Sequence, residues 1–300
     1  MNAPAQHGTA SGDATIAIQK LARSTGSNVQ ELQTLYVLEA LLSRVAHSAY
    51  REDFILKGGV LLSAFALRRP TRDIDLQAAG LANDTSTVAG RIGEIAGISV
   101  PDGVTFDQAS IVASVIREGD QYSAVRVKLV GILGTSRLTV GIDVNFGDPI
   151  SPDPQIVDLP QLIDIGQPRV AILGYPLTMV LAEKVTTAID RGVANTRWRD
   201  FADVYGLIRS HQVRGDELAT SLAVVAAYRG ISLRPLLPAL AEMPGTAQTK
   251  WAAWRSRTSR QNDLPLLFSE VLEAVAGFAD PIIYGGAGTW SPRESSWGGA

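Results

Sequence analysis

Hydrophobic positions recur every three or four residues near the start of the chain and again in its second half, while a period of two dominates between them. The first spacing is typical of helices and the second of strands. The helical pattern predicts helices over 14–24, 27–47, 60–67, 85–95, 176–190, 197–209, 216–228, 234–242 and 263–278. The alternating pattern predicts strands over 71–76, 122–132 and 137–146, the last two joined as a hairpin.

This order of elements indicates an α+β fold, with a helical start, a core that holds a small mixed sheet, and a helical second half. Residues 1–13 are small and polar and are expected to form a flexible leader, and 147–168 carry five prolines and are expected to form a loop-rich crossing. We therefore divide the chain into this leader, a core over 14–170, a helical lobe over 171–284, and a loose tail rich in Gly and Ser over 285–300.

Composition changes this picture mainly by exclusion. The net charge of −3 argues against a strongly basic nucleic-acid binder, although a local basic patch is compatible with it. The absence of cysteine excludes disulfides, thiolate zinc sites and cysteine nucleophiles, and the three histidines are scattered. A signal-peptide pattern and an apolar run of about 18 residues are both missing, so we expect a cytoplasmic protein with no membrane partner.

Two carboxylates in the first predicted strand are the leading candidates for chemistry. Asp73 and Asp75 would project from one face while Ile74 and Leu76 pack behind them. Adjacent carboxylates repel each other unless a cation neutralises them, and Mg²⁺ prefers oxygen ligands. The plainer alternative is that both residues form the solvated face of an edge strand.

A glycine pair before this strand favours the metal hypothesis. Gly58 and Gly59 follow Lys57 and would let the backbone approach a phosphate closely. The arginines at 68, 69 and 72 lie between the glycines and the acids. A glycine pair alone is weak support, but its combination with paired aspartates fourteen residues later is stronger.

A third carboxylate is expected from the strand over 137–146. Asp143 would share a face with Gly141 and Asn145, opposite its apolar neighbours. If this strand lies beside 71–76, it completes a metal site of Asp73, Asp75 and Asp143. A polar face covered by water is the alternative.

The second half offers a lysine on an apolar helix face. Lys184 falls among Leu177, Val180 and Ala188 in projection, so it must either extend to solvent or meet an anion, such as a triphosphate. On the next predicted helix, Asp200 projects toward the apolar side, and could bind a metal-linked water, orient Lys184 or contact the nucleotide. The alternative for Asp200 is a favourable charge in a first helical turn, and Asp203, projecting toward the polar side, is expected to be structural.

Two blocks of residues stand out along the chain. The first is Lys57-Gly58-Gly59 with Arg69-x-Thr71-x-Asp73-Ile74-Asp75-Leu76, and the second is Leu181-Ala182-Glu183-Lys184 with Arg191 and Arg197-x-Arg199-Asp200-Phe201-x-Asp203. These blocks resemble those of a known family, the AbiEii-type nucleotidyltransferase toxins, which include the mycobacterial MenT toxins. The glycine pair with Asp-x-Asp alone would fit the whole polymerase-β-like superfamily, but the two blocks in this order are more specific. Arg199 departs from the family, where lysine is common, and residues beyond about 210 match nothing recognisable.

The resemblance implies a polymerase-β-like core with a helical C-terminal lobe, transfer of a nucleotide from an NTP, an acceptor at the 3′ end of tRNA, and a cognate antitoxin. The catalytic set predicted on this basis is Asp73, Asp75, Asp143, Lys184 and Asp200, with Mg²⁺ on the first three. The nucleotide-binding set is Lys57, Gly58, Gly59, Arg69, Thr71 and Lys184. The acceptor-binding set is Arg68, Arg72, Arg191, Arg197 and Arg199, for which a solvated charged face is the alternative.

The predicted reaction is attack of an acceptor hydroxyl on the α-phosphorus of an NTP, with release of pyrophosphate. Two rival functions use the same residues. One is a small-molecule nucleotidyltransferase of the antibiotic-modifying kind, and the other is a non-catalytic nucleotide-binding or antitoxin-binding module. Intact Asp73, Asp75 and Lys184 argue against the second rival.

Overall fold

The computed structural model describes residues 7–118, 122–167, 169–258 and 261–299. The chain forms two compact units. We call Met1–Gly147 with Gln155–Gly174 the sheet unit, and Asp148–Pro154 with Tyr175–Ala300 the helical unit. A short segment of the proline-rich crossing therefore belongs to the helical unit although its neighbours on both sides belong to the sheet unit.

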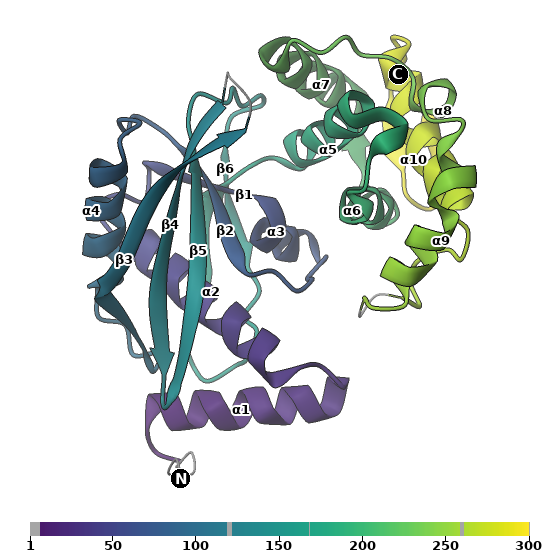
Figure 1. Ribbon diagram of the computed structural model, residues 1–300. Coiled ribbons are helices and arrows are strands. Elements are labelled where there is room, and N and C mark those ends of the chain that lie inside the picture. Colours follow the sequence, from purple (N-terminus) through teal and green to yellow (C-terminus); the bar gives the residue numbers. More distant parts are fainter. Residues whose placement is uncertain (1–6, 119–121, 168, 259–260, 300) are drawn as a thin grey trace. The chain divides into compact units, whose positions relative to one another are not determined.

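The sheet unit contains four α-helices, one 3-10 helix and seven strands in its described part (Figure 1). The helices are α1 (Ala10–Thr25), α2 (Val29–His47), α3 (Gly58–Leu61), η1 (Leu62–Phe65) and α4 (Thr85–Ala96). The strands are β1 (Phe54–Lys57), β2 (Asp73–Ala78), β3 (Val104–Glu118), β4 (Tyr122–Leu133), β5 (Ser136–Asn145), β6 (Gln155–Leu159) and β7 (Val170–Gly174).

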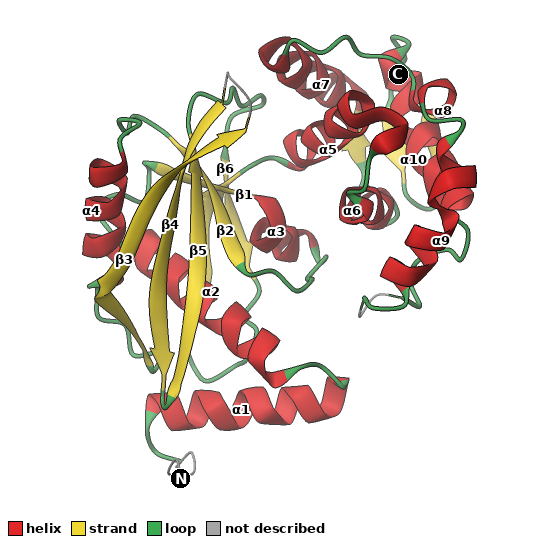
Figure 2. Cartoon of the chain, viewed as in Figure 1, coloured by secondary structure: helices red, strands yellow, loops and turns green. Residues whose placement is uncertain are grey.

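The seven strands form one mixed sheet in the order β3-β4-β5-β2-β1-β7-β6. Figure 2 shows β3, β4, β5 and β2 side by side in yellow. The β4–β5 hairpin and the β3–β4 pair are antiparallel, whereas β2 runs parallel to β5. Helix α2 packs on the sheet, and Val37 lies where a side chain at Gly131 of β4 would stand. Because residues alternate along a strand, Arg126 of β4 points to the opposite face from Gly131.

Local sequence explains where the long helices begin. The Thr9 hydroxyl accepts a hydrogen bond from the backbone N–H of Gly12, and the Asn28 side chain accepts from Gln30 and Glu31. These caps satisfy N–H groups that lack partners in the first helical turn. Inside the unit, Arg44 of α2 pairs with Asp102 before β3, and both side chains are 2% exposed. Arg44 also donates to the carbonyl of Val104, which anchors the start of β3 to α2.

The helical unit is built mainly from helices, with one small sheet of three short antiparallel strands in the order β10-β9-β8. Its helices are α5 (Leu177–Arg191), η2 (Gly192–Ala194), α6 (Trp198–Ile208), α7 (Gly215–Arg229), α8 (Leu236–Ala239), α9 (Met243–Arg255) and α10 (Phe268–Ile283). Its strands are β8 (Val213–Arg214), β9 (Thr289–Ser291) and β10 (Ser296–Gly298).

Aromatic side chains form the centre of the helical unit. Phe268 of α10 meets Phe201 and Trp198 of α6 edge-on, with ring centroids 5.2 and 5.4 Å apart. Such pairs contribute about 1 kcal/mol each beyond the burial of their surface. Helix α6 is thereby fixed against α10.

Within the tail predicted to be loose, over 285–300, the stretch 289–298 forms the β9–β10 hairpin. Trp290 donates its indole N–H to the carbonyl of Ile208 at 2.7 Å, and Trp297 donates to the carbonyl of Phe278 at 2.9 Å. Trp297 also stacks on the Phe278 ring. The prediction from the glycine and serine content was wrong because the two tryptophans hold the segment in place. Their rings pack against Phe278, and their indole N–H groups bond to backbone carbonyls.

Several other boundaries differ from prediction. Helix α1 begins at Ala10, inside the predicted leader, whose residues 1–6 lie outside the described part. The helix expected over 60–67 is two short turns that end at Ala66, a residue with φ of 56°. The strands that were not predicted are β1, β3, β6, β7, β8, β9 and β10, and helix α9 was not predicted either. Helix α10 begins five residues later than expected. The helices predicted over 14–24, 27–47, 85–95, 176–190, 197–209 and 216–228 are confirmed by α1, α2, α4, α5, α6 and α7.

Candidate functional site

Three aspartates lie on adjacent strands of the sheet unit. Strand β5 is the parallel neighbour of β2, with Asp75 in register with Asp143 and Asp73 in register with Gly141. Paired residues on neighbouring strands point to the same face, so the predicted strand arrangement is confirmed. Ile74, buried between the two β2 aspartates, points to the other face and anchors the strand in the core.

Two glycines leave the space that these carboxylates occupy. A Cβ atom at Gly58 would lie 1.9 Å from Oδ2 of Asp75, and one at Gly141 would lie 2.2 Å from Oδ1 of Asp73. Both distances are far below van der Waals contact. Any side chain at either position would displace an aspartate, so glycine is needed at both places for the acids to stand where they do. The need at Gly58 is doubled by its φ of +67°, which favours glycine.

An arginine that the sequence analysis missed binds the third aspartate. Arg126 of β4 is opposite Asp143 of β5 in the antiparallel register. Its Nε donates to Oδ1 of Asp143 at 2.6 Å and its Nη2 donates to Oδ2, so the pair is bidentate. Asp143 is 15% exposed and Arg126 39% exposed. We call the face that carries Asp73, Asp75, Asp143 and Arg126 the acid face.

All three aspartates act on this one guanidinium. The pKa of Arg126 is raised above its ordinary value, first by its hydrogen bonds to Asp143 and then by the negative charges of Asp143, Asp73 and Asp75, against an opposing effect of burial. Arg126 therefore stays cationic and partly neutralises the acid face. A cation in this position could have been anticipated, since the predicted hairpin turn fixes which residues face each other across β4 and β5.

The remaining predicted nucleotide-binding residues of the sheet unit gather around the glycine pair. Lys57 is opposite Asp75 in the β1–β2 register and only 8% exposed. A Cβ atom at Gly59 would lie 3.0 Å from the Thr71 hydroxyl and 3.2 Å from a guanidinium nitrogen of Arg69. The first motif block thus converges in space, beside Asp75.

Arg68, predicted to bind an acceptor, is engaged within the sheet unit. Its guanidinium donates to Glu39 of α2 and to the carbonyl of Pro160. Glu39 also accepts from the backbone N–H of Leu162 at 2.9 Å. Burial raises the pKa of Glu39, although Arg68 acts in the opposite direction. These contacts fasten the segment before Asp73 to α2, so we treat Arg68 as a positioning residue.

The acid face suits a magnesium ion by its donor chemistry. Asp73 and Asp75 are oxygen donors on one strand face, and Mg²⁺ is commonly held by one or two carboxylates together with substrate phosphates. The third predicted ligand, Asp143, directs both oxygens to Arg126. Among the residues that the structure describes, no three His, Asp or Glu side chains form a group placed to hold a metal. Asp73 and Asp75 are therefore the fitting pair, and the role of Asp143 as a ligand stays a prediction.

Lys184 in the helical unit forms a cluster with two aspartates. Its Nζ donates to Asp200 at 2.8 Å and to Asp203 at 3.0 Å. The exposed fractions are 12% for Lys184, 17% for Asp200 and 1% for Asp203. Lys184 thus meets carboxylates of α6 and does not extend into solvent. This contact is what the prediction that Asp200 orients Lys184 requires. The prediction that Asp203 points to the polar side was wrong. A helical projection considers only the residues of α6, whereas Asp203 is buried against Lys184 of α5. We call these three residues the lysine cluster.

Of the other predicted acceptor-binding arginines, one belongs to the sheet unit and three to the helical unit. Arg72 is exposed in the segment before β2, and Arg191 and Arg199 are exposed at the end of α5 and the start of α6. Arg197 is half exposed and lies 3.9 Å from Asp200. Their exposure is compatible both with phosphate binding and with a solvated charged face.

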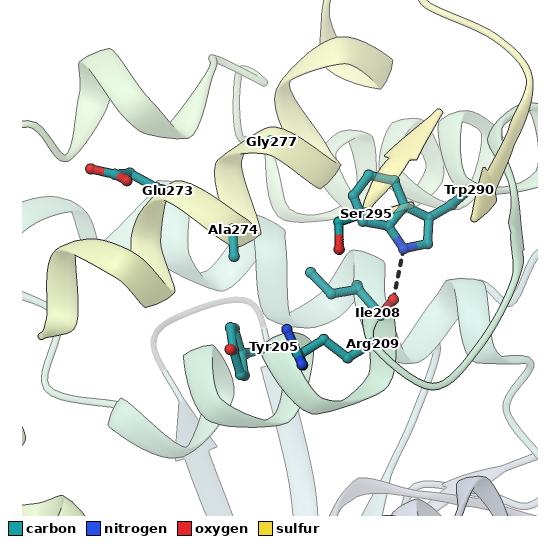
Figure 3. Close-up of a pocket in the computed structure, with 8 residues that line it drawn as sticks. All are labelled: Tyr205, Ile208, Arg209, Glu273, Ala274, Gly277, Trp290 and Ser295. Carbon is teal, nitrogen blue, oxygen red and sulfur yellow. Dashed lines mark hydrogen bonds between the residues drawn. The ribbon is translucent and has the colours of Figure 1, made fainter. Parts of the chain in front are cut away.

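A separate hollow in the helical unit contains none of the predicted site residues (Figure 3). The Arg209 guanidinium lies over the Tyr205 ring there, 5.3 Å from its centroid. The hollow is lined by Tyr205, Ile208, Arg209, Glu273, Ala274, Gly277, Trp290 and Ser295.

Comparison with known proteins decides the family. The model of the AbiEii nucleotidyl transferase toxins of type IV toxin–antitoxin systems matches residues 40–275. The chain belongs to this family. A comparison with curated proteins gives no match. The AbiEii match covers both motif blocks and extends well past residue 210, the region that could not be placed from sequence.

Two solved structures from Helicobacter pylori match this AbiEii chain, one of them with a TM-score above 0.5. JHP933 shares 13% identity at a TM-score of 0.51, covering 86% of this chain and 94% of JHP933. A second protein, provisionally titled as a nucleotidyltransferase, shares 14% identity at a TM-score of 0.44, covering 86% and 95% of the two chains. The predicted α+β fold is thus shown, and its mixed sheet is consistent with a polymerase-β-like core.

The protein is therefore a nucleotidyltransferase toxin by its family. The family implies an NTP as co-substrate and a cognate antitoxin as partner. Within the described part of the chain, the helices are too short or too polar to cross a bilayer.

Proposed function

We propose that the protein transfers a nucleotide from an NTP to a hydroxyl at the 3′ end of tRNA, with release of pyrophosphate. The observation that carries this proposal is the acid face, where Asp73 and Asp75 stand together in space left by Gly58 and Gly141. In the cell, we further propose that this activity occurs in the cytoplasm and arrests growth unless the cognate antitoxin counteracts it.

In the proposed reaction the acceptor oxygen forms a bond to the α-phosphorus, and the bond from that phosphorus to the bridging oxygen breaks. Asp73 and Asp75 would hold Mg²⁺, which supplies positive charge against the phosphate oxygens. Asp143 is the candidate receiver of the hydroxyl proton. The glycine pair, with Lys57, Arg69 and Thr71, would line the nucleotide site.

Lys184 and Asp200 are the residues proposed for this reaction from the helical unit. Lys184 would neutralise the β- and γ-phosphates, and its contact with Asp200 would fix where the ammonium stands. Positioning and charge stabilisation would supply most of the rate, because phosphoryl-type transfer requires little covalent chemistry from the protein.

A tRNA acceptor is supported by exposed arginines on a chain with a net charge of −3. Arg72, Arg191, Arg197 and Arg199 would contact phosphates of the acceptor strand. Phosphate contacts make binding depend on salt, so RNA modification should weaken steeply between about 50 and 200 mM salt.

The test is incubation of the pure protein and Mg²⁺ with each of four α-³²P-labelled NTPs, using purified tRNA in one arm and aminoglycosides in the other. We expect label on tRNA, lost when the 3′ end is blocked, and no label with the Asp73→Asn variant. Label on aminoglycosides alone would establish the small-molecule alternative and overturn the toxin proposal. Nucleotide binding without transfer to either acceptor would establish the non-catalytic alternative.

A further inference from the structure

The acid face contains its own cations. Three aspartates are accompanied by Arg126, bound to Asp143 through two hydrogen bonds, and by Lys57, opposite Asp75 in the strand register. Lys57 is 8% exposed and Asp143 15% exposed, so solvent screens them only partly. The face therefore carries a smaller negative charge than its three carboxylates alone would give it.

Arg126 also removes ligand positions. A bidentate guanidinium occupies one lone pair on each carboxylate oxygen, and both oxygens of Asp143 accept from Arg126. Free Mg²⁺ gives up its water reluctantly and is held well only where several anionic oxygens converge. With Asp143 engaged, Asp73 and Asp75 alone are a weak site for a free ion, whereas a bound triphosphate would add further anionic oxygens.

We infer that Arg126 is a positioning residue that keeps the affinity of the acid face for a free divalent cation low, so that the ion is held only together with the nucleotide. This inference rests on the proposed function. Arg126 acts through Asp143 and through the charge of the face. The bound metal ion then depends on the NTP, which makes the nucleotide-free protein insensitive to changes in free Mg²⁺.

The test measures binding of Mn²⁺ to the full-length protein without nucleotide, from the electron paramagnetic resonance signal of the unbound ion. Arg126→Gln removes the charge and keeps a hydrogen-bonding side chain, whereas Arg126→Lys keeps the charge. Arg137→Gln is the matched control, because Arg137 forms an ion pair with Asp107 at 2.8 Å in the same sheet, six residues before Asp143 along β5.

We expect Arg126→Gln to bind Mn²⁺ at least about tenfold more tightly than the wild type, because a cation beside the site is lost. Arg126→Lys should stay within about threefold of wild type and Arg137→Gln should be unchanged. Adding Asp73→Asn to Arg126→Gln should abolish the gain. In the wild type, a non-hydrolysable analogue of one of the four NTPs should tighten Mn²⁺ binding.

Binding by Arg126→Gln that is no tighter than wild type would overturn the inference, and so would a gain that survives Asp73→Asn. Equal tightening by Arg126→Lys would show that charge is not the cause. A purely structural Arg126 would lower the melting temperature of Arg126→Gln without changing Mn²⁺ affinity. Wild-type protein that transfers no nucleotide, with these Mn²⁺ results intact, would refute the proposed function and leave the role of Arg126 standing.

Discussion

The acid face and the lysine cluster both combine aspartates with a cation, but they are built for different purposes. On the acid face, Asp73 and Asp75 are partly exposed and sit in space left by glycines. In the lysine cluster, Asp203 is 1% exposed and Lys184 donates to it and to Asp200 at once. The first arrangement places two carboxylates of one strand side by side where glycines leave space for them, whereas the second pairs its carboxylates with an ammonium and holds α5 to α6.

The contrast teaches that a charged motif residue is not a ligand site until its partners are known. Both motif blocks contain acids and bases at suggestive spacings. Only the block on the sheet places two carboxylates on one strand with glycines beside them. Repulsion between the two carboxylates makes this arrangement costly in free energy when no cation is bound. We therefore expect mutations of the acid face to reduce activity and mutations of the lysine cluster to reduce stability first.

The largest effect is expected at the paired aspartates. Asp73→Asn and Asp75→Asn each remove a charged oxygen donor and keep the side-chain volume. Nucleotide transfer should fall at least about a thousandfold, which corresponds to roughly 4 kcal/mol of barrier, while the circular dichroism spectrum and melting temperature stay near wild type. Asp107→Asn, a surface control in the same sheet, should leave transfer unchanged. Retention of more than about a tenth of the activity would sink the assignment.

Lys184→Ala should destabilise the protein by about 3 kcal/mol, because it removes the ammonium from a pair with a buried carboxylate. This differs from what a lysine directed only at phosphates would give, which is normal stability with poor NTP use. Chemical denaturation measures the difference. Adding Asp203→Leu should recover much of the stability without recovering transfer. An unaltered free energy of unfolding for Lys184→Ala would show that the ion pairs of the lysine cluster do not stabilise the fold.

Replacing glycine tests the space on the acid face. Gly58→Ala places a Cβ atom 1.9 Å from Oδ2 of Asp75, whereas Gly80, with a similar φ of +73°, has no atom within 4 Å of such a Cβ. Both alanines should cost about 1 kcal/mol of stability through left-handed strain. Only Gly58→Ala should also lose transfer, by tenfold or more. Equal activity in the two variants would mean that Asp75 tolerates displacement and that the space is incidental.

The smallest effect is expected at Arg197, which is 50% exposed and 3.9 Å from Asp200. Arg197→Gln should change stability by less than about 0.5 kcal/mol, as is usual for an exposed ion pair. If it contacts RNA phosphate, tRNA affinity should fall and the slope of log affinity against log salt should decrease by about one. Filter binding over a salt series measures this slope, and an unaltered slope would assign Arg197 to the solvated surface.

The amino-acid sequence was sufficient to locate the acid face, because alternation along one strand fixes which residues share a side. Placing the two predicted strands side by side was enough to bring the three acids together, whereas the pairing of Asp75 with Asp143 came from the structure. The register of the β4–β5 hairpin would have added Arg126. Strands β3 and β7 were missed because their pairing partners determine them more than their own residues do. Leu56 of β1, for example, pairs with Gly174 far along the chain.

The lysine cluster shows a different limit. A helical projection ranks residues by their neighbours on the same helix, so Asp203 was placed on the polar side of α6. Its burial depends on Lys184, which comes from α5. A polar residue buried by a partner from another element gives no periodic signal in its own helix, so only the tertiary structure can reveal it.

The segment Asp148–Pro154 limits how this protein can be taken apart. It packs with the helical unit, where the carbonyl of Ser151 accepts a hydrogen bond at 2.6 Å from the Ser221 hydroxyl, on a residue that is 0% exposed. A gene split after codon 174 would yield a C-terminal half without the segment Asp148–Pro154. The buried Ser221 hydroxyl would then lack its acceptor, which would lower the free energy of unfolding by about 1 to 3 kcal/mol. For split-protein reporters or for crystallography of each unit alone, residues 148–154 would therefore have to be joined to the C-terminal half. The N-terminal half would need a new loop that connects residue 147 to residue 155.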